Sequence, residues 1–345
     1  MAVKDVTIKD IAKAADVSFA TVSRALNHNP GVSEATREHI IQLAEEMGYR
    51  KNTIAASLAS NKTKSLGLIV PELANPYFSS LMVAIKKKLS KLGYTLLICN
   101  SGWDPVLEEK LLRSLLERRV DGIFLYPCES ENNGLYEHLR LPLLLFSDRE
   151  TNKEKRAYVN VDHYRSGVMA TRHLLDQGYK KPAFLGGNMT STSTLMRLNG
   201  FQDVLKERGV AIPPDYASEG KYLIDSGHQR THEILSKEDR PDAFFCANDL
   251  IALGCMAAVT EMGFTLGQDI GVIGVDNVAY SAFPQIDLSS IHIPIDEMGV
   301  LGVELLMEII NKKEDEAEEE RETTGFALLE PELIIRATTC RSRKK

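Results

Sequence analysis

From Ser65 onward, apolar runs of strand length alternate with amphipathic helical stretches, and this alternation restricts the possible folds most strongly. The strand-like runs are "LGLIVP", "YTLLICN", "GIFLYP", "LLLFSD", "AFLGG", "AFFCAN" and "IGVIGVD". Helical periodicity falls near residues 77–92, 105–119, 164–178, 197–209, 226–236, 249–262 and 297–311. Such alternation predicts parallel sheets covered by helices on both faces. Because the rhythm appears twice, before and after about residue 163, we expect two doubly wound lobes.

Polar and aromatic side chains follow the expected strands. In open α/β sheets, ligands collect at the carboxyl ends of the strands, and between two lobes they lie in the cleft. Those ends carry Asn75-Pro76-Tyr77-Phe78, Asn100-Ser101-Gly102-Trp103, Asp148-Arg149, Asn248-Asp249 and Asp276-Asn277. Carboxylates, amides and arginine can bind neighbouring hydroxyls, and aromatic faces pack on sugar rings. Although Asn and Asp also favour turns and helix caps, the set as a whole predicts a polyhydroxylated ligand.

The first fifty residues have a different pattern, which is typical of three short helices. The apolar positions follow helical spacing and are Ile8, Ile11, Ala12 and Ala15, then Val22, Ala25 and Leu26, then Ile40, Leu43, Ala44 and Met47. Thr7, Ser18 and Ser33 are good N-caps for these segments. A four-residue break separates the first two helices. This is the layout of a helix-turn-helix, whose second helix enters the major groove of DNA.

The outward side chains of the second helix are candidates for contact with DNA. The positions that would face base edges are Phe19, Ala20, Ser23 and Arg24. Arginine pairs bidentately with guanine, and hydroxyls of the kind found in Ser18, Thr21 and Ser23 suit phosphate oxygens. Residues 1–64 carry a net charge of +2 and the remainder −9, which favours an anion-binding head on an acidic body. Any small helical bundle with a solvated surface would also fit this pattern.

A resemblance adds to the residue pattern. The segment "VTIKDIAKAADVSFATVSRALNHNPGVSEATREHIIQLAEEMGYRKN" resembles the DNA-binding head of the lac repressor/galactose repressor (LacI/GalR) family. The resemblance implies that Phe19, Ala20 and Arg24 read bases, with the first two setting operator preference. The residues that it places near phosphate are Thr7, Ser18, Thr21, Ser23 and Asn27.

Residues 51–64, "KNTIAASLASNKTK", form the expected hinge. A helix in this segment is too short to persist alone in water, so a flexible tether is the alternative. The resemblance implies that the hinge folds only on the operator, paired with that of its dimer mate in the minor groove. Leu58 would then wedge into the central base step, and contacts with the bent DNA would offset the partial unstacking.

The resemblance continues through the body. It implies an N-terminal all-α helix-turn-helix head plus an α/β, periplasmic-binding-protein-like core of two doubly wound parallel-sheet lobes. Matching segments include "LGLIVPELANPYFSSLM", "GGNMTSTSTLMRLNGF" and "IGVIGVDNVAYS". The effector-facing residues that it implies are Tyr77, Phe78, Asp148, Arg197, Tyr222, Asn248 and Asp276. Trp103, the only tryptophan, could line the same pocket, but we expect it to pack instead.

In this fold the chain crosses between the lobes three times, so each lobe is discontinuous. Residues 1–50 would form the DNA-binding head and residues 51–64 the hinge. The N-terminal lobe would contain residues 65–163 and 292–325, and the C-terminal lobe residues 164–291 and 326–340.

Signals of other protein classes are weak. The chain has no G-x-S-x-G nucleophile turn and no phosphate loop, so we expect neither catalytic residues nor a cofactor. His228 and His232 lack the rest of a metal-binding motif, and no metal is predicted. No apolar run is long enough to cross a membrane, and the start lacks the apolar stretch of a secretory signal. Five scattered cysteines predict reduced thiols in the cytoplasm.

Together these features predict a cytoplasmic, sequence-specific transcription regulator. We expect a repressor of carbohydrate uptake or catabolism genes, controlled by a sugar or sugar phosphate bound between the lobes. A homodimer would match a pseudo-palindromic double-stranded operator. A purine- or phosphoprotein-responsive regulator is the alternative within the family. A soluble sugar-binding protein without DNA function, or an α/β enzyme acting on a sugar or nucleoside, is the alternative outside it.

Overall fold

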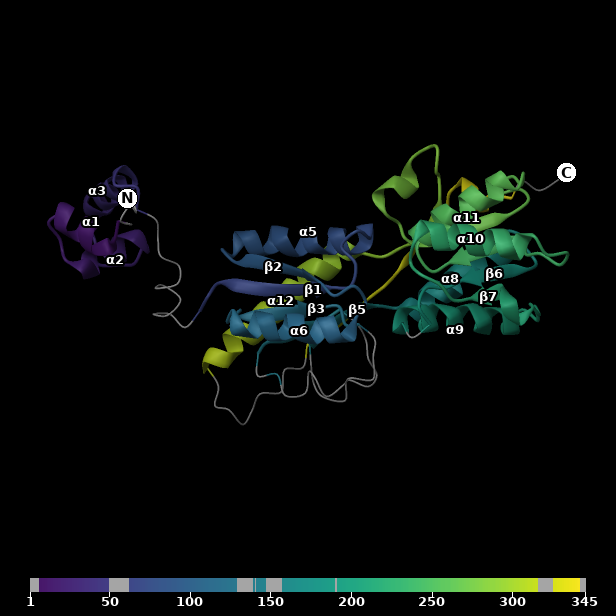
Figure 1. The fold of residues 1–345 in the computed structure, drawn as a ribbon, viewed down its shortest axis with the longest axis horizontal. Helices are drawn as coiled ribbons and strands as arrows, with labels where there is room; N and C mark the ends of the chain where they lie inside the picture. Colours follow the sequence, from purple (N-terminus) through teal and green to yellow (C-terminus); the bar gives the residue numbers. More distant parts are fainter. Residues whose placement is uncertain are drawn as a thin grey trace. The chain divides into compact units, whose positions relative to one another are not determined.

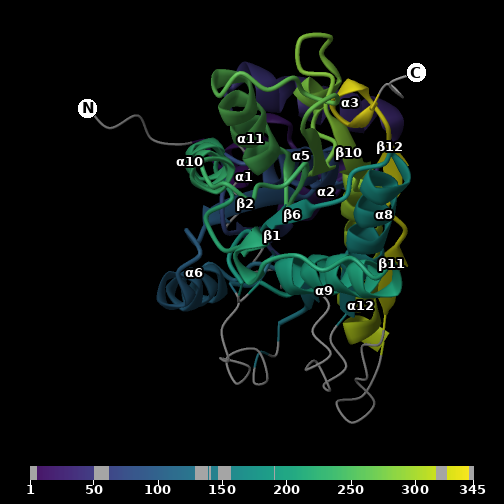
Figure 2. The same ribbon diagram turned by 90° about the vertical axis from the view of Figure 1, so that its right-hand side faces the viewer.

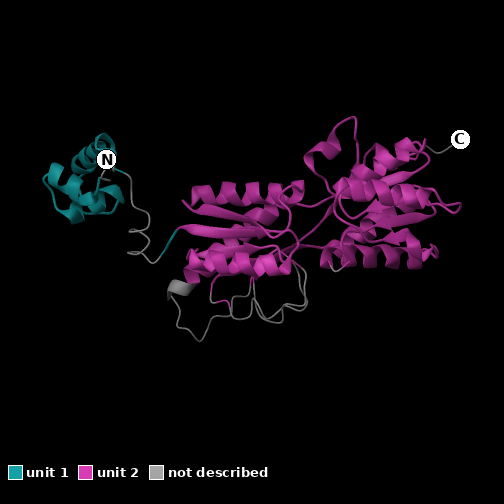
Figure 3. Ribbon diagram, viewed as in Figure 1, with its two compact units in different colours: residues 1–63 teal, residues 64–345 magenta. Residues whose placement is uncertain are grey.

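The chain forms two compact units, residues 1–63 and 64–345 (Figure 3). The computed structural model describes residues 6–49, 62–128, 139, 141–146, 157–189, 191–315 and 325–341. Most of the predicted hinge, including Leu58, and the predicted strand-end pair Asp148-Arg149 lie outside these described ranges. Within the described ranges, no helix combines the length and the apolar character needed to cross a membrane.

The N-terminal unit is a helix-turn-helix. Its helices are α1 (Ile8–Ala14), α2 (Phe19–Leu26) and α3 (Glu34–Glu46). They enclose a small apolar core of Ile11, Ala12, Val22, Ala25, Ile40 and Ala44. The turn before α2 contains Asp16, whose φ of 52° is left-handed, a conformation that aspartate adopts more readily than most side chains. The structure therefore confirms the three predicted helices and the break between the first two.

The first lobe of the second unit is a six-stranded parallel sheet (Figure 1). In spatial order its strands are β11 (Phe326–Leu329), β5 (Ala157–Val161), β4 (Leu143–Leu145), β3 (Gly122–Leu125), β1 (Ser65–Val70) and β2 (Thr95–Asn100). Helix α6 (Pro105–Glu117) covers one face, and α5 (Pro76–Lys91) and α12 (Ile295–Asp315) cover the other. Strands β3 and β4 are buried throughout, as expected of strands covered on both faces.

The second lobe repeats this design. In spatial order its strands are β12 (Glu332–Ile334), β10 (Ser289–His292), β9 (Gly271–Asp276), β8 (Ala243–Cys246), β6 (Pro182–Leu185) and β7 (Ala217–Ser218). All neighbours are parallel except β12, which runs antiparallel to β10. Two packed helix pairs flank the sheet, α8 (His163–Asp176) with α9 (Thr192–Glu207) and α10 (Ile224–Leu235) with α11 (Asp249–Glu261).

The chain passes between the two sheets three times, after β5, after β10 and after β11. The third passage corrects the expectation that residues 326–340 belong wholly to the C-terminal lobe. Strand β11 pairs in parallel with β5 of the first sheet, and Figure 2 shows it beside α12. The chain joins the second sheet only at β12. Strand periodicity gives the faces of an edge strand but not the sheet that it joins.

Candidate functional site

Helix α2 presents the predicted base-reading side chains to solvent. Phe19 is 55% exposed, and Ala20 and Arg24 are exposed as well. Ala20 and Arg24 are four residues apart and therefore share one face of the helix. The early turns of the second helix are those that approach base edges in a helix-turn-helix. The structure thus leaves all three predicted residues exposed on α2.

The polar residues predicted near phosphate also shape the ends of the helices. Ser18 Oγ accepts a hydrogen bond from the Thr21 backbone N–H at 3.1 Å and contacts Thr21 Oγ1 at 2.8 Å. Asn27 Nδ2 donates to the Ser23 carbonyl oxygen at 2.9 Å. Thr7 donates through its hydroxyl to the Asp10 carboxylate at 2.6 Å. These contacts fix both ends of α2 and the start of α1, and the phosphate role of these residues stays a prediction.

Sequence reasoning missed Arg37, a buried arginine of α3 that holds the C-terminal end of α2. Its Nη1 donates to the Ala25 carbonyl oxygen at 3.1 Å, and its Nη2 to the Asn29 carbonyl oxygen at 3.0 Å. The last carbonyls of a helix lack intrahelical partners, and a positive charge is favourable there. The available signal was spacing, because Arg37 lies on the same helical stripe as Ile40 and Ala44.

Replacing Arg37 by methionine should therefore loosen α2. A hydrogen bond to a charged group contributes about 1.5–3 kcal/mol. We expect roughly ten-fold less amide protection in α2, which corresponds to the lower end of this energy range. Hydrogen exchange of the full-length protein measures this effect. Amides of the second unit serve as the internal control, and unchanged protection of Val22 and Ala25 would contradict the role of Arg37.

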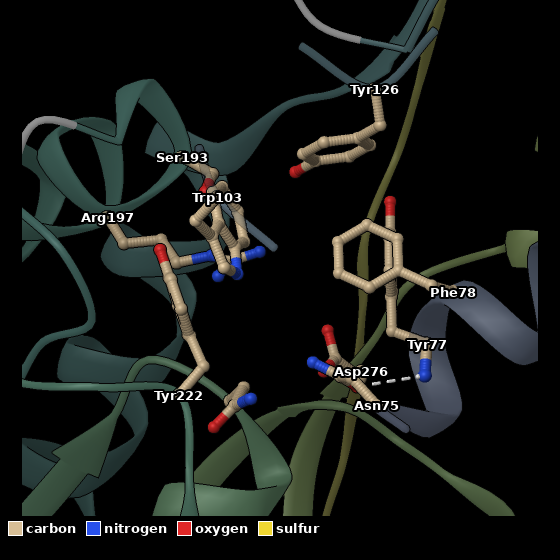
Figure 4. A pocket seen from close by; sticks show the side chains of 10 residues that line it. Asn75, Tyr77, Phe78, Trp103, Tyr126, Ser193, Arg197, Tyr222 and Asp276 are labelled. Carbon is tan, nitrogen blue, oxygen red and sulfur yellow. Dashed lines mark hydrogen bonds between the residues drawn. The ribbon is translucent and has the colours of Figure 1, made fainter. Parts of the chain in front are cut away.

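One cavity of the second unit brings together residues from both lobes (Figure 4). Its empty volume is about 360 Å³, part of which is open to solvent. The lining residues are Asn75, Tyr77, Phe78, Trp103, Tyr126, Ser193, Arg197, Tyr222, Asn248 and Asp276. Six of the seven effector-facing residues that the resemblance implies are among them, and the seventh is Asp148. Their assignment to an effector stays a prediction, but the structure places these six around a single space.

Aromatic rings form a large part of the cavity wall. Trp103, from the end of β2, stacks on Tyr222 of the other lobe with ring centroids 5.7 Å apart and planes 20° apart. Phe78 and Tyr126 meet edge to face at 4.8 Å. The expectation that Trp103 only packs is thus wrong in part, since it packs and also lines the cavity.

Tyr222 is held from two further sides. Its hydroxyl lies 2.5 Å from Thr194 Oγ1. A Cβ at Gly187 would lie only 2.1 Å from the Tyr222 ring, so the ring position requires a glycine there. With Trp103 on one side, these contacts give Tyr222 a fixed orientation at the cavity before any ligand binds.

The polar side of the cavity centres on Arg197 and Asp276, which are 5% and 6% exposed. Burial raises the pKa of Asp276 well above its usual value, and the nearby Arg197 charge opposes that rise. The backbone of Asp276 has a φ of 105°, which is strained for a residue with a side chain and is typical of functional positions. A ligand that donates hydrogen bonds to Asp276 would favour the ionised form of this buried side chain.

Two asparagines line the cavity while capping helices. Asn75 Oδ1 accepts from the Tyr77 N–H at 3.0 Å, and Asn248 Oδ1 accepts from the Ile251 N–H at 2.9 Å. Asn248 Nδ2 and Arg197 Nε are buried and have no hydrogen-bond partner among the described residues. Buried donors usually have an acceptor, so a bound ligand is a candidate for supplying one.

The strand-end rule explains which lining residues the sequence could reveal. Tyr126 directly follows β3, so the same rule could have found it, as it found Asn75. Ser193 lies inside the first turn of α9 and has no comparable signal. Asp249, which the rule also selected, points inward instead, and its carboxylate accepts from Ser281 Oγ and Ser290 Oγ at 2.7 Å.

Among the described residues, no group of three or more His, Cys, Asp or Glu side chains is arranged to hold a metal. His228, one of the two histidines weighed as a ligand, instead contacts Glu261 at 2.7 Å through Nε2.

Comparison with known proteins decides the family. The chain matches "Bacterial regulatory proteins, lacI family" over residues 7–52 and "Periplasmic binding protein-like domain" over residues 171–339. It is 34% identical to the HTH-type transcriptional repressor PurR of Pasteurella multocida (strain Pm70), over 96% of this chain and 97% of that protein. The chain belongs to the LacI family. The HTH-type transcriptional repressor PurR of Histophilus somni (strain 129Pt) is 32% identical, over 96% of this chain and 98% of that protein.

Solved LacI-family structures share the whole architecture. The lac repressor bound to ONPG in the repressed state has a TM-score of 0.85 and 29% identity, covering 97% of this chain and 100% of its own. The lac repressor dimer bound to operator and the anti-inducer ONPF has a TM-score of 0.84 and 27% identity, covering 97% and 99%. The predicted family and fold class are confirmed. The protein is a DNA-binding LacI-family repressor controlled by an effector, and this family is not one of enzymes.

Proposed function

We propose that the effector is a purine-class molecule bound between the two lobes. The observation that carries this proposal is full-length similarity to repressors named PurR, which are purine-responsive. The similarity covers nearly the whole chain and therefore includes the cavity as well as the head. The predicted sugar effector becomes the second candidate.

The cavity supports a flat aromatic ligand. Trp103 and Tyr222 stack on each other with ring centroids 5.7 Å apart, so a base would lie against an outer ring face and not between them. Stacking of a nucleic-acid base on an aromatic side chain contributes about 1–3 kcal/mol. A purine edge carries both donors and acceptors. Asp276 can accept from its N–H groups, and Arg197 and Asn248 can donate to its ring nitrogens or carbonyl oxygen.

A sugar remains a candidate because the same polar groups can bind neighbouring hydroxyls. The regulator CelR, 25% identical with a TM-score of 0.71, has been solved as a cellobiose complex. A carbohydrate effector would preserve the prediction that the controlled genes serve carbohydrate uptake or catabolism.

Trp103 makes the two candidates easy to separate. It is the only tryptophan in the chain and it lines the cavity, so its fluorescence should report ligand entry. We expect guanine, hypoxanthine or adenine to change the emission of the full-length protein saturably, and calorimetry to give the same affinity. Ribose, glucose and galactose should have no effect. A saturable response to sugars alone would replace the purine proposal.

On the DNA side, we propose that Arg24 pairs with guanine while Phe19 and Ala20 contact neighbouring bases, and that Leu58 enters the minor groove. The residues proposed to contact phosphates are Thr7, Ser18, Thr21, Ser23 and Asn27. A homodimer in the cytoplasm would present two heads to a pseudo-palindromic operator. The lac repressor dimer on its operator supports this arrangement.

A further inference from the structure

We infer that His163 is a positioning residue for Arg197, because its ring accepts a hydrogen bond that holds the guanidinium at the wall of the cavity. The inference rests on the proposed function in that this cavity binds the effector. His163 is not one of the lining residues, so it acts on a ligand only through Arg197.

Close packing of α8 on α9 brings the two side chains together. A Cβ at Gly167 of α8 would lie 2.2 Å from the Arg197 carbonyl oxygen, so the helices can approach this closely only with a glycine there. His163 is the first residue of α8 and is 7% exposed. Its Nδ1 lies 3.2 Å from Arg197 Nη2. The distance is therefore set by two packed helices.

Only one protonation state of His163 fits this contact. A guanidinium donates hydrogen bonds and cannot accept them, so Nδ1 must carry a lone pair and Nε2 the proton. A doubly protonated ring would bring a second positive charge against Arg197. Burial and the Arg197 charge both hold the pKa of His163 well below its usual value, which keeps the ring neutral at neutral pH.

Arg197 has a second anchor on another element. Its Nη1 donates to the Ala247 carbonyl oxygen at 2.7 Å, directly after β8. Two anchors on different elements fix the plane of the guanidinium, and a fixed plane matters because arginine recognises its partners through planar geometry. Without His163, the Arg197 guanidinium would keep only its hydrogen bond to the Ala247 carbonyl oxygen. It could then rotate about that contact and lose its alignment with the ligand.

The test compares His163→Leu, which removes the acceptor, with His163→Asn, whose Oδ1 can replace Nδ1. Guanine is titrated into each full-length variant and followed by Trp103 fluorescence. We expect His163→Leu to bind roughly ten-fold more weakly, as the loss of a hydrogen bond to a charged group implies. His163→Asn should recover most of that affinity. If His163→Leu binds like the unmodified protein, or His163→Asn no better than His163→Leu, the inference is wrong.

His173→Leu is a matched control for the loss of a buried histidine in α8. His173 Nε2 lies 2.7 Å from Thr339 Oγ1 and does not line the cavity, so guanine affinity should not change.

A second readout needs no ligand and separates this inference from the purine proposal. In ¹⁵N-histidine NMR of the full-length protein, the signal lost in His163→Asn identifies His163. We expect it to show the neutral ring protonated at Nε2. A proton on Nδ1 would overturn the inference even if purines bind, and the expected tautomer would support it even if the unmodified protein binds no purine.

Discussion

Replacing Arg197 by methionine should weaken binding of a purine base by about 2–5 kcal/mol, which corresponds to at least roughly a 30-fold loss of affinity. Arg197 is almost fully buried, and its charge opposes the rise in the pKa of Asp276. The variant would therefore lose its own donors and also favour protonation of the Asp276 carboxylate, which would remove an acceptor for ligand N–H groups. Calorimetry on the full-length protein measures this loss.

Arg208→Met is the matched control for Arg197→Met. Arg208 lies just beyond α9, and its Nη2 forms an exposed ion pair with Asp176 at 3.0 Å. Exposed ion pairs contribute little to stability, so this variant should bind the base like the unmodified protein. Equal losses in the two variants would show that removing any arginine near α9 impairs the fold, and would contradict a direct role for Arg197.

Replacing Arg24 by alanine should weaken operator binding by about 1–3 kcal/mol and relax specificity at one base pair, as expected for lost bidentate pairing with guanine. Arg24 is exposed on α2, and the hydrogen bonds that cap the helix are made by Ser18 and Asn27. Removing the Arg24 side chain should therefore leave the helix caps in place. A gel-shift titration with a duplex selected from a random library, repeated with single-base variants, measures both effects.

Arg113→Ala provides the control for Arg24→Ala, because Arg113 is an exposed arginine of α6 that pairs with Glu109. It should leave operator binding unchanged. The contradicting result is that Arg24→Ala loses the same operator affinity on every duplex, with the salt dependence of binding reduced by about one phosphate contact. That result would show that Arg24 contacts the DNA phosphate backbone and not a base.

The architecture could be predicted from the sequence because its signals are local and repeated. The seven strand-like runs and the seven helical stretches all correspond to elements of the structure. Five strands of the described residues were not among the predicted runs, namely β5, β7, β10, β11 and β12. Of these, β7 and β12 have only two and three residues, which give no usable periodicity. The third passage between the lobes was predicted before residue 326, but it occurs after β11. The sequence around an edge strand does not show which distant strand it pairs with.

The candidate site was predictable in part for a similar reason. Strand ends meet at one edge of a sheet, so Asp276 and Asn248 could be selected without knowing their partners. Arg197 lies in a helix and was singled out only by the family resemblance. The contact between His163 and Arg197 depends on how closely α8 approaches α9, and no local pattern reports that distance.

If a ligand in the interlobe cavity controls how the head binds its operator, the ligand must change operator affinity through the cavity residues. Operator affinity is measured with and without guanine at physiological ionic strength, for the unmodified protein and for Arg197→Met. We predict that the base changes operator affinity in the unmodified protein, and that Arg197→Met loses this response while still binding the operator. If the two proteins respond equally to the base, the cavity described here does not control the head.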